Sequence, residues 1–173
     1  MVIKVTSANS IGLTVHKILV EVDITNSLPQ IVIVGLGDTA VSEAKERLKL
    51  AIKNSGYSFP NTKVVINLAP ANLKKEGVIY DLAMAVGILG KEKIIQNVPN
   101  NIAFLGELSL DGSIRPVNGV LAIVSELKNF KIDKVIVPYE NLSEASFADD
   151  IEIYGARNLI EVVEFLNNNQ GLK

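Results

Sequence analysis

Five ionisable side chains lie within eight residues of one another, between a run typical of a strand and a run typical of a helix. They are Lys74, Lys75, Glu76, Tyr80 and Asp81. The β-branched run 64–66 predicts a strand, Pro70 interrupts it, and the apolar segment that continues through Leu89 predicts a helix. Polar groups on a loop between a rigid strand and a helix amino terminus are well placed for binding or catalysis. This loop is the first candidate site.

A second candidate is a row of lysines on the helix predicted over residues 38–55. Apolar residues recur there at helical spacing. On another face of the same helix, Lys45, Lys49 and Lys53 follow one another at one-turn intervals, with Arg47 nearby. Such a row is either a solvated face or a surface that meets DNA or an acidic partner subunit.

A pair of glycines after a predicted strand formally satisfies the dinucleotide-binding fingerprint. The segment Gly35-Leu36-Gly37-Asp38-Thr39-Ala40 matches G-x-G-x-x-G/A between an apolar run and a helix. The fingerprint also requires an acidic residue about 20 positions on, at the end of the next strand, but that strand ends at Asn67. The glycines are therefore assigned to a tight turn, and no cofactor is predicted in this chain. The phosphate-binding pattern G-x-x-x-x-G-K-[ST] is absent from the sequence, so ATP hydrolysis is not assigned to these residues.

Composition limits the classes of function. The chain has 173 residues, 48% of them hydrophobic, with a mean hydropathy of +0.30, which is typical of one globular domain. Its net charge of −2 argues against tight DNA binding by this chain alone. The absence of cysteine and the single histidine leave no thiolate or histidine metal site. The start of the chain lacks a signal-peptide pattern, and no apolar run approaches the roughly 20 residues that span a bilayer, so we expect a cytoplasmic protein without a membrane partner.

Periodicity along the chain predicts a mixed α/β order of elements. Two paired strands are expected within 2–25; further strands at 30–34, 63–66, 134–137 and 151–154; a hairpin of 102–110 with 113–117; and helices at 38–55, 120–130, 143–148 and 158–167. Asp38 or Thr39 is expected to cap the first helix and Asn158 the last, because a short side-chain oxygen satisfies the amides of the first turn. The polar tail from Asn167 is expected to fray.

Several phrases fall in the order and at the spacing of one protein family. They are Leu28-Pro29, Val34-Gly35-Leu36, Asn67-Leu68-Ala69-Pro70-Ala71, Lys75-Glu76-Gly77, Tyr80-Asp81-Leu82 and Gly106-Glu107-Leu108. Over nearly its whole length the chain resembles the amino-terminal domain of the magnesium-chelatase-like competence protein (ComM/YifB) family. The resemblance implies an α/β fold with a mixed sheet, like the Lon proteolytic domain, around a ribosomal-protein domain 2-like βαβ core. It also implies that residues 1–166 form the domain and that the polar tail 167–173 leads to a missing AAA+ ATPase domain.

The likeness to the Lon domain raises the question of a serine–lysine peptidase. Matching the family's phrases places the nucleophile position at Ile79 and the position of the basic lysine at Leu121. Neither side chain can act as a nucleophile or a general base. The chain is therefore predicted to be a non-catalytic assembly or coupling domain. An active Ser–Lys peptidase domain and a fragment of a magnesium-chelatase-type ATPase subunit are the alternatives.

The resemblance also implies partners. These are other copies of the protein in a hexameric ring, the ATPase domain in cis with its ATP and magnesium, and DNA for the whole protein. In the family the motor drives branch migration of DNA during recombination and natural transformation. In such a ring the residues of the first candidate site would form a subunit or domain contact. The structural alternative is that Asp81 complements its helix dipole and that Glu76 pairs with a surface lysine.

Overall fold

Alternating apolar residues near the start of the chain form a long hairpin at the middle of the fold. β1 (Ile3–Ile11) and β2 (Thr14–Thr25) pair antiparallel in a register that sets Val5 opposite Val20. Gly12 closes the turn with φ +65°, in the left-handed region that favours glycine. The computed structural model describes residues 1–73, 75, 77–168 and 172, and it confirms the two paired strands predicted within 2–25.

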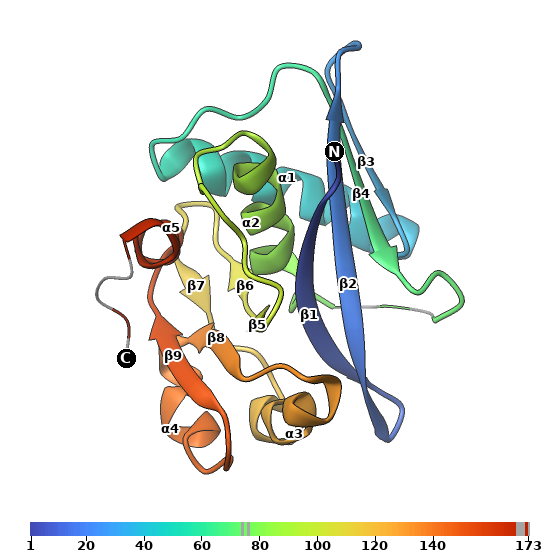
Figure 1. Ribbon diagram of the computed structural model, residues 1–173. Coiled ribbons are helices and arrows are strands. Elements are labelled where there is room, and N and C mark those ends of the chain that lie inside the picture. Colours follow the sequence, from blue (N-terminus) through green and yellow to red (C-terminus); the bar gives the residue numbers. More distant parts are fainter. Residues whose placement is uncertain (74, 76, 169–171, 173) are drawn as a thin grey trace.

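The hairpin belongs to a mixed sheet, seven-stranded in the described part of the chain (Figure 1). The other strands are β3 (Gln30–Val34), β4 (Lys63–Ala69), β5 (Ile102–Phe104), β8 (Lys134–Pro138) and β9 (Glu152–Ala156). Their order is β3-β4-β2-β1-β5-β8-β9, and β2 runs antiparallel to both of its neighbours, β4 and β1. The pairs β3/β4, β1/β5, β5/β8 and β8/β9 are parallel. The predicted α/β fold with a mixed sheet is confirmed.

Helices pack against the central strands on both faces. Of the helices, α2 (Asp81–Lys91) and α3 (Val120–Glu126) contact β1 and β2. The other helices that the structure describes are α1 (Asp38–Asn54), α4 (Leu142–Ala145), α5 (Leu159–Asn168) and the 3-10 turns η1 (Leu127–Phe130) and η2 (Tyr139–Asn141). α2 is apolar nearly all round and therefore buried, with Gly87 seated against Val22 and Val5 of the hairpin. Thr6 and Ala8 point to the opposite face of β1 and are buried too, and α3 contacts β1 and β2.

The predicted strand 102–110 is divided in the structure. β5 joins the large sheet, whereas β6 (Glu107–Leu108) pairs only with β7 (Ile114–Arg115), among the described residues. The division falls at Gly106, whose amide donates a hydrogen bond to the Ile79 carbonyl. The strand leaves the sheet here because its backbone bonds to the loop before α2 instead of to a neighbouring strand.

The helix caps agree only in part with prediction. The N-cap of α1 is Gly37, which has no side chain to accept a hydrogen bond from the amides of the first turn. Neither Asp38 nor Thr39 therefore caps this helix. Asn158 does cap α5, because its Oδ1 accepts a hydrogen bond from the Glu161 amide at 2.9 Å.

The described residues at the end of the chain make contacts that its composition does not predict. α5 continues to Asn168, and Asn167 donates a hydrogen bond to the Ile94 carbonyl at 2.8 Å. The fraying expected of the tail 167–171 is therefore wrong at Asn167 and Asn168, the part of it that the structure describes. Leu172 is buried as well, and 169–171 lie outside the described residues. Within the described ranges, no helix is both long enough and apolar enough to cross a membrane.

Replacing Gly87 with alanine tests how α2 is seated on the hairpin. An alanine Cβ would lie 2.4 Å from a methyl carbon of Val22, too close for a van der Waals contact. We expect Gly87→Ala to lower the free energy of unfolding by about 1–3 kcal/mol, despite the roughly 1 kcal/mol that alanine gains over glycine in a helix. Urea unfolding measures the loss. Gly87→Ala should cost less in a Val22→Ala background, and a stabilising effect in the wild-type background would contradict this packing.

Candidate functional site

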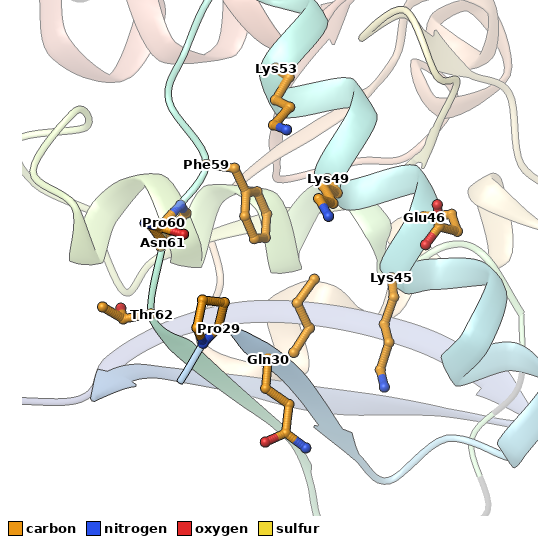
Figure 2. A pocket seen from close by; sticks show the side chains of 11 residues that line it. Pro29, Gln30, Lys45, Glu46, Lys49, Lys53, Phe59, Pro60, Asn61 and Thr62 are labelled. Carbon is orange, nitrogen blue, oxygen red and sulfur yellow. The ribbon is translucent and has the colours of Figure 1, made fainter. Parts of the chain in front are cut away.

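The three lysines of the predicted row line one groove (Figure 2). Lys45, Lys49 and Lys53 extend from α1 over an open groove of about 340 Å³. The opposite wall is formed by the start of β3 and the loop that leads into β4. The other lining residues are Pro29, Gln30, Ile31, Phe59, Pro60, Asn61 and Thr62, together with Glu46 of α1. The sequence predicted the lysine row, and the fold adds the opposite wall.

The amphipathic packing of α1 orients the row. The buried residues of α1 are Ala44, Leu48, Ala51 and Ile52. They recur every three or four positions and hold one face of the helix against the core. Because residues four apart lie about one turn apart, the lysines on the flanking face stay in line, with a rise of about 6 Å between one and the next.

Positive charge dominates this groove. Three lysines and one carboxylate, that of Glu46, line it. Among the described residues, the ion pairs of lysine are Lys91 with Asp23 and Lys128 with Asp150, and none involves the row. The charge of the row is therefore not neutralised by the carboxylates that the structure describes, which suits the groove to an anionic partner.

Arg47 lies apart from the row and forms a buried ion pair. It is about 200° around the helix from Lys45, since successive residues are about 100° apart. Its Nε and Nη2 donate to the two carboxylate oxygens of Asp81 at 2.6 and 3.1 Å. Asp81 has 1% of its surface exposed and also accepts a hydrogen bond from the Leu108 amide at 3.1 Å. Burial raises the pKa of Asp81, the Arg47 guanidinium opposes that rise, and the pair ties α1 to α2 and β6.

Tyr80 and Lys75 also point inward. Tyr80 is fully buried, and its hydroxyl accepts a hydrogen bond from Nδ2 of Asn9 at 3.2 Å. Burial raises the pKa of Tyr80. Lys75 has 1% of its surface exposed, and its Nζ donates to the carbonyl oxygens of Pro70 and Leu73. Burial lowers the pKa of Lys75.

These positions favour the structural alternative for the first candidate site. The expectation that Lys75, Tyr80 and Asp81 face a partner subunit or DNA is corrected, because buried side chains cannot reach such a partner. Their hydrogen bonds serve the loop and the start of α2. Lys74 and Glu76 belong to the same candidate site and lie outside the described residues.

The two positions matched to a peptidase dyad are apolar, and one of them lines a cleft. Ile79, with 4% of its surface exposed, lines a cleft of about 310 Å³. Its other lining residues are Asn9, Gly77, Val78, Glu107, Pro116, Val117 and Asn118. Leu121 is half-buried in the first turn of α3, shortly after the 116–118 wall. Of the described residues that line the cleft, none carries a hydroxyl, thiol, imidazole or amine side chain.

The glycines of the dinucleotide-like segment have a packing role at Gly35. Its φ is +106°, and a Cβ placed there would lie 2.7 Å from the Leu68 carbonyl oxygen. Only glycine allows the end of β3 to pass this close to β4. In the described part of the chain, no three His, Cys, Asp or Glu side chains gather as a metal site.

Sequence reasoning missed two partners that the fold supplies. Phe59 lines the same groove as Lys45, Lys49 and Lys53, which we call the lysine groove. The one sequence feature that could have indicated it is an aromatic residue inside a connecting loop, in a chain with only five phenylalanines. The pairing of Arg47 with Asp81 had no local signal, because the two residues are 34 positions apart.

Comparison with known proteins places these features in a family context. A family model described as "Subunit ChlI of Mg-chelatase" matches residues 20–141. Competence protein ComM of Haemophilus influenzae is 34% identical over 169 residues, covering 97% of this chain and 33% of that protein. An uncharacterized protein of Mycobacterium tuberculosis is 40% identical over 163 residues, covering 93% of this chain and 32% of that protein. The chain thus spans about a third of the length of these relatives, and the resemblance to ComM is confirmed.

A more distant likeness bears on the fold. Lon protease 2 of Bacillus subtilis is 30% identical over 122 residues, covering 69% of this chain and 21% of that protein. This similarity, together with the mixed sheet, is consistent with the predicted Lon-like fold.

Removing Arg47 tests the buried ion pair. Arg47→Met leaves the Asp81 carboxylate buried without its guanidinium, so we expect the free energy of unfolding at neutral pH to fall by roughly 3–5 kcal/mol. The penalty should shrink as the pH falls through the raised pKa of Asp81, because the protonated carboxyl is no longer a buried charge. Urea unfolding at several pH values measures both effects.

The exposed pair of Lys128 and Asp150 provides the control, since Lys128→Met should cost less than about 1 kcal/mol. The double variant Arg47→Met/Asp81→Asn should lose less than the sum of its two single variants. A loss in Arg47→Met no greater than in Lys128→Met would contradict a structural role for the pair.

Proposed function

Because the chain belongs to the family described as "Subunit ChlI of Mg-chelatase", we propose that it is a non-catalytic amino-terminal assembly and coupling domain of a larger AAA+ ATPase that acts on DNA. In this proposal the ATPase domain lies in cis and binds ATP and magnesium, and the whole protein assembles as a hexameric ring. The similarity to a protein named as a competence protein supports a role on DNA, and we propose that this role is branch migration in recombination and natural transformation.

The observation that carries the proposal is the groove with three lysines. Phosphate neutralisation by lysine and arginine supplies most of the affinity of non-specific DNA binding. Lys45, Lys49 and Lys53 lie in line on one helix, and no described carboxylate forms an ion pair with them. They are thus suited to contact successive phosphates of one nucleic-acid strand.

The expected affinity of one domain is low. Three phosphate contacts on a chain of net charge −2 give weak binding that salt screens strongly. In a ring, several copies would present the row together, and linking weak sites raises the overall affinity by roughly 10²–10⁴ without any new contact. The domain would therefore contribute to DNA binding chiefly in the assembled protein.

The alternatives have weaker support. A Ser–Lys peptidase needs a nucleophile and a base where this chain has Ile79 and Leu121. A chelatase-type activity finds no cluster of metal-binding side chains among the described residues. A cleft without a reactive side chain among its described lining residues is consistent with a domain that has this fold and a different function.

Charge reversal tests the groove. Lys45→Glu/Lys49→Glu should leave the thermal unfolding of the 173-residue chain nearly unchanged, since Lys49 is exposed, Lys45 is half-buried, and neither forms an ion pair among the described residues. It should weaken duplex DNA binding at low salt and reduce the slope of log affinity against log salt by roughly 2, about 0.9 for each lost phosphate contact. Fluorescence anisotropy across a salt series measures both. In the protein with its ATPase domain, DNA-stimulated ATP hydrolysis should fall as well.

Lys128→Glu/Lys131→Glu is the matched control, because it changes the net charge equally at two exposed lysines beside α3. This control should keep most of the DNA affinity. If both double variants lower affinity and slope equally, or neither does, the row is only a solvated face.

Assays for peptide cleavage test the absence of catalysis. The purified chain should cleave neither casein nor fluorogenic peptides above background, because Ile79 and Leu121 have no reactive group. Cleavage that persists through purification and disappears on replacement of a single serine would establish the peptidase alternative.

A further inference from the structure

Resting on the proposed role of the lysine groove in DNA binding, we propose that the groove takes single-stranded rather than duplex nucleic acid, and that Phe59 is the surface on which an unpaired base stacks. The lysines hold the backbone, and the aromatic ring holds the base. This combination of a basic groove with an aromatic platform is the general physical solution for binding single strands without sequence preference.

The position of Phe59 carries the inference. Its half-buried ring points into the groove from the loop before β4, on the side that faces Lys49 of α1 (Figure 2). The inner side of the ring packs against the core, so the ring has a fixed seat. The following Pro60 restricts the backbone of Phe59, which lowers the entropy lost on binding.

A duplex cannot use this platform. Its bases are paired and stacked on one another, so an aromatic ring outside the helix meets only phosphates and base edges. An unpaired base, in contrast, offers its whole face to the ring, a contact that typically changes affinity by 5- to 150-fold, or about 1–3 kcal/mol. Phe59 therefore discriminates between the two forms, whereas the lysines alone do not.

The remaining lining groups fit a sequence-tolerant site. Gln30, Asn61 and Thr62 offer amide and hydroxyl groups around Phe59, which can bond a sugar or a base edge. The lysines follow one another every four residues along the opposite wall, with a rise of about 6 Å from one to the next. The row therefore runs alongside an extended nucleic-acid backbone.

The test compares an oligothymidine with a blunt duplex of equal length, both fluorescein-labelled, on the 173-residue chain at low salt. Phe59→Leu keeps an apolar side chain and removes the aromatic face. It should weaken oligothymidine binding by roughly 5- to 150-fold and leave duplex binding and both salt slopes nearly unchanged. Lys45→Gln/Lys49→Gln should weaken both ligands and reduce the single-strand slope by roughly 1.4, about 0.7 for each phosphate contact.

A second variant guards against misfolding of Phe59→Leu. The chain has no tryptophan, so Phe59→Trp introduces one fluorophore at the platform. Oligothymidine should quench its emission and the duplex should not, with affinity for the single strand retained.

The outcomes separate the two proposals. If Phe59→Leu affects both ligands alike or neither, and the lysine variant weakens both, the single-strand inference is wrong and the DNA groove stands. If neither ligand binds in a manner that depends on Lys45 and Lys49, both proposals fail. If polyglutamate displaces labelled oligothymidine as effectively as unlabelled oligothymidine does at the same concentration of charges, the groove is a general polyanion site and the role of Phe59 is overturned.

Discussion

The buried pair of Arg47 and Asp81 is the contact on which the arrangement of this domain depends. A carboxylate with 1% of its surface exposed is costly unless a cation and hydrogen-bond donors surround it. Arg47 supplies two donors and the Leu108 amide a third, so one carboxylate holds α1, α2 and β6 together. The same geometry fixes the position of α1 relative to α2, because a displaced α1 would leave the Asp81 carboxylate unpaired.

The pair also decides which way the rest of α1 faces. The helix has a buried face, a flank that carries Arg47 toward Asp81, and another flank that carries the lysine row toward β3. The orientation of the helix is set by packing and by the ion pair, neither of which involves the lysines. The lysine row therefore has no direct part in holding the helix in place. Its lysines can be substituted to test binding without loss of the fold.

The cleft beside Ile79 and the groove lined by the lysine row are two separate hollows of the same fold. Ile79 and the 116–118 segment line one cleft, and the lining side chains that the structure describes include no hydroxyl, thiol, imidazole or amine. Ile79 belongs to the hydrophobic core, and Val117 packs against it. The DNA-binding role that we propose for this chain rests on the lysine groove, in a different part of the same scaffold.

The sequence alone determined the elements and the family, because periodicity and motif spacing are local properties. It predicted the β1–β2 hairpin, the lysine row and the Asn158 cap, all of which depend on neighbours within a few residues. Tertiary structure alone decided that Lys75, Tyr80 and Asp81 are buried, and that the 102–110 strand divides at Gly106. It also decided that Phe59 joins the lysines and Arg47 meets Asp81. Such contacts join segments that are distant in the sequence. They depend on burial and on long-range hydrogen bonds, which the local preference of a residue for helix or strand does not predict.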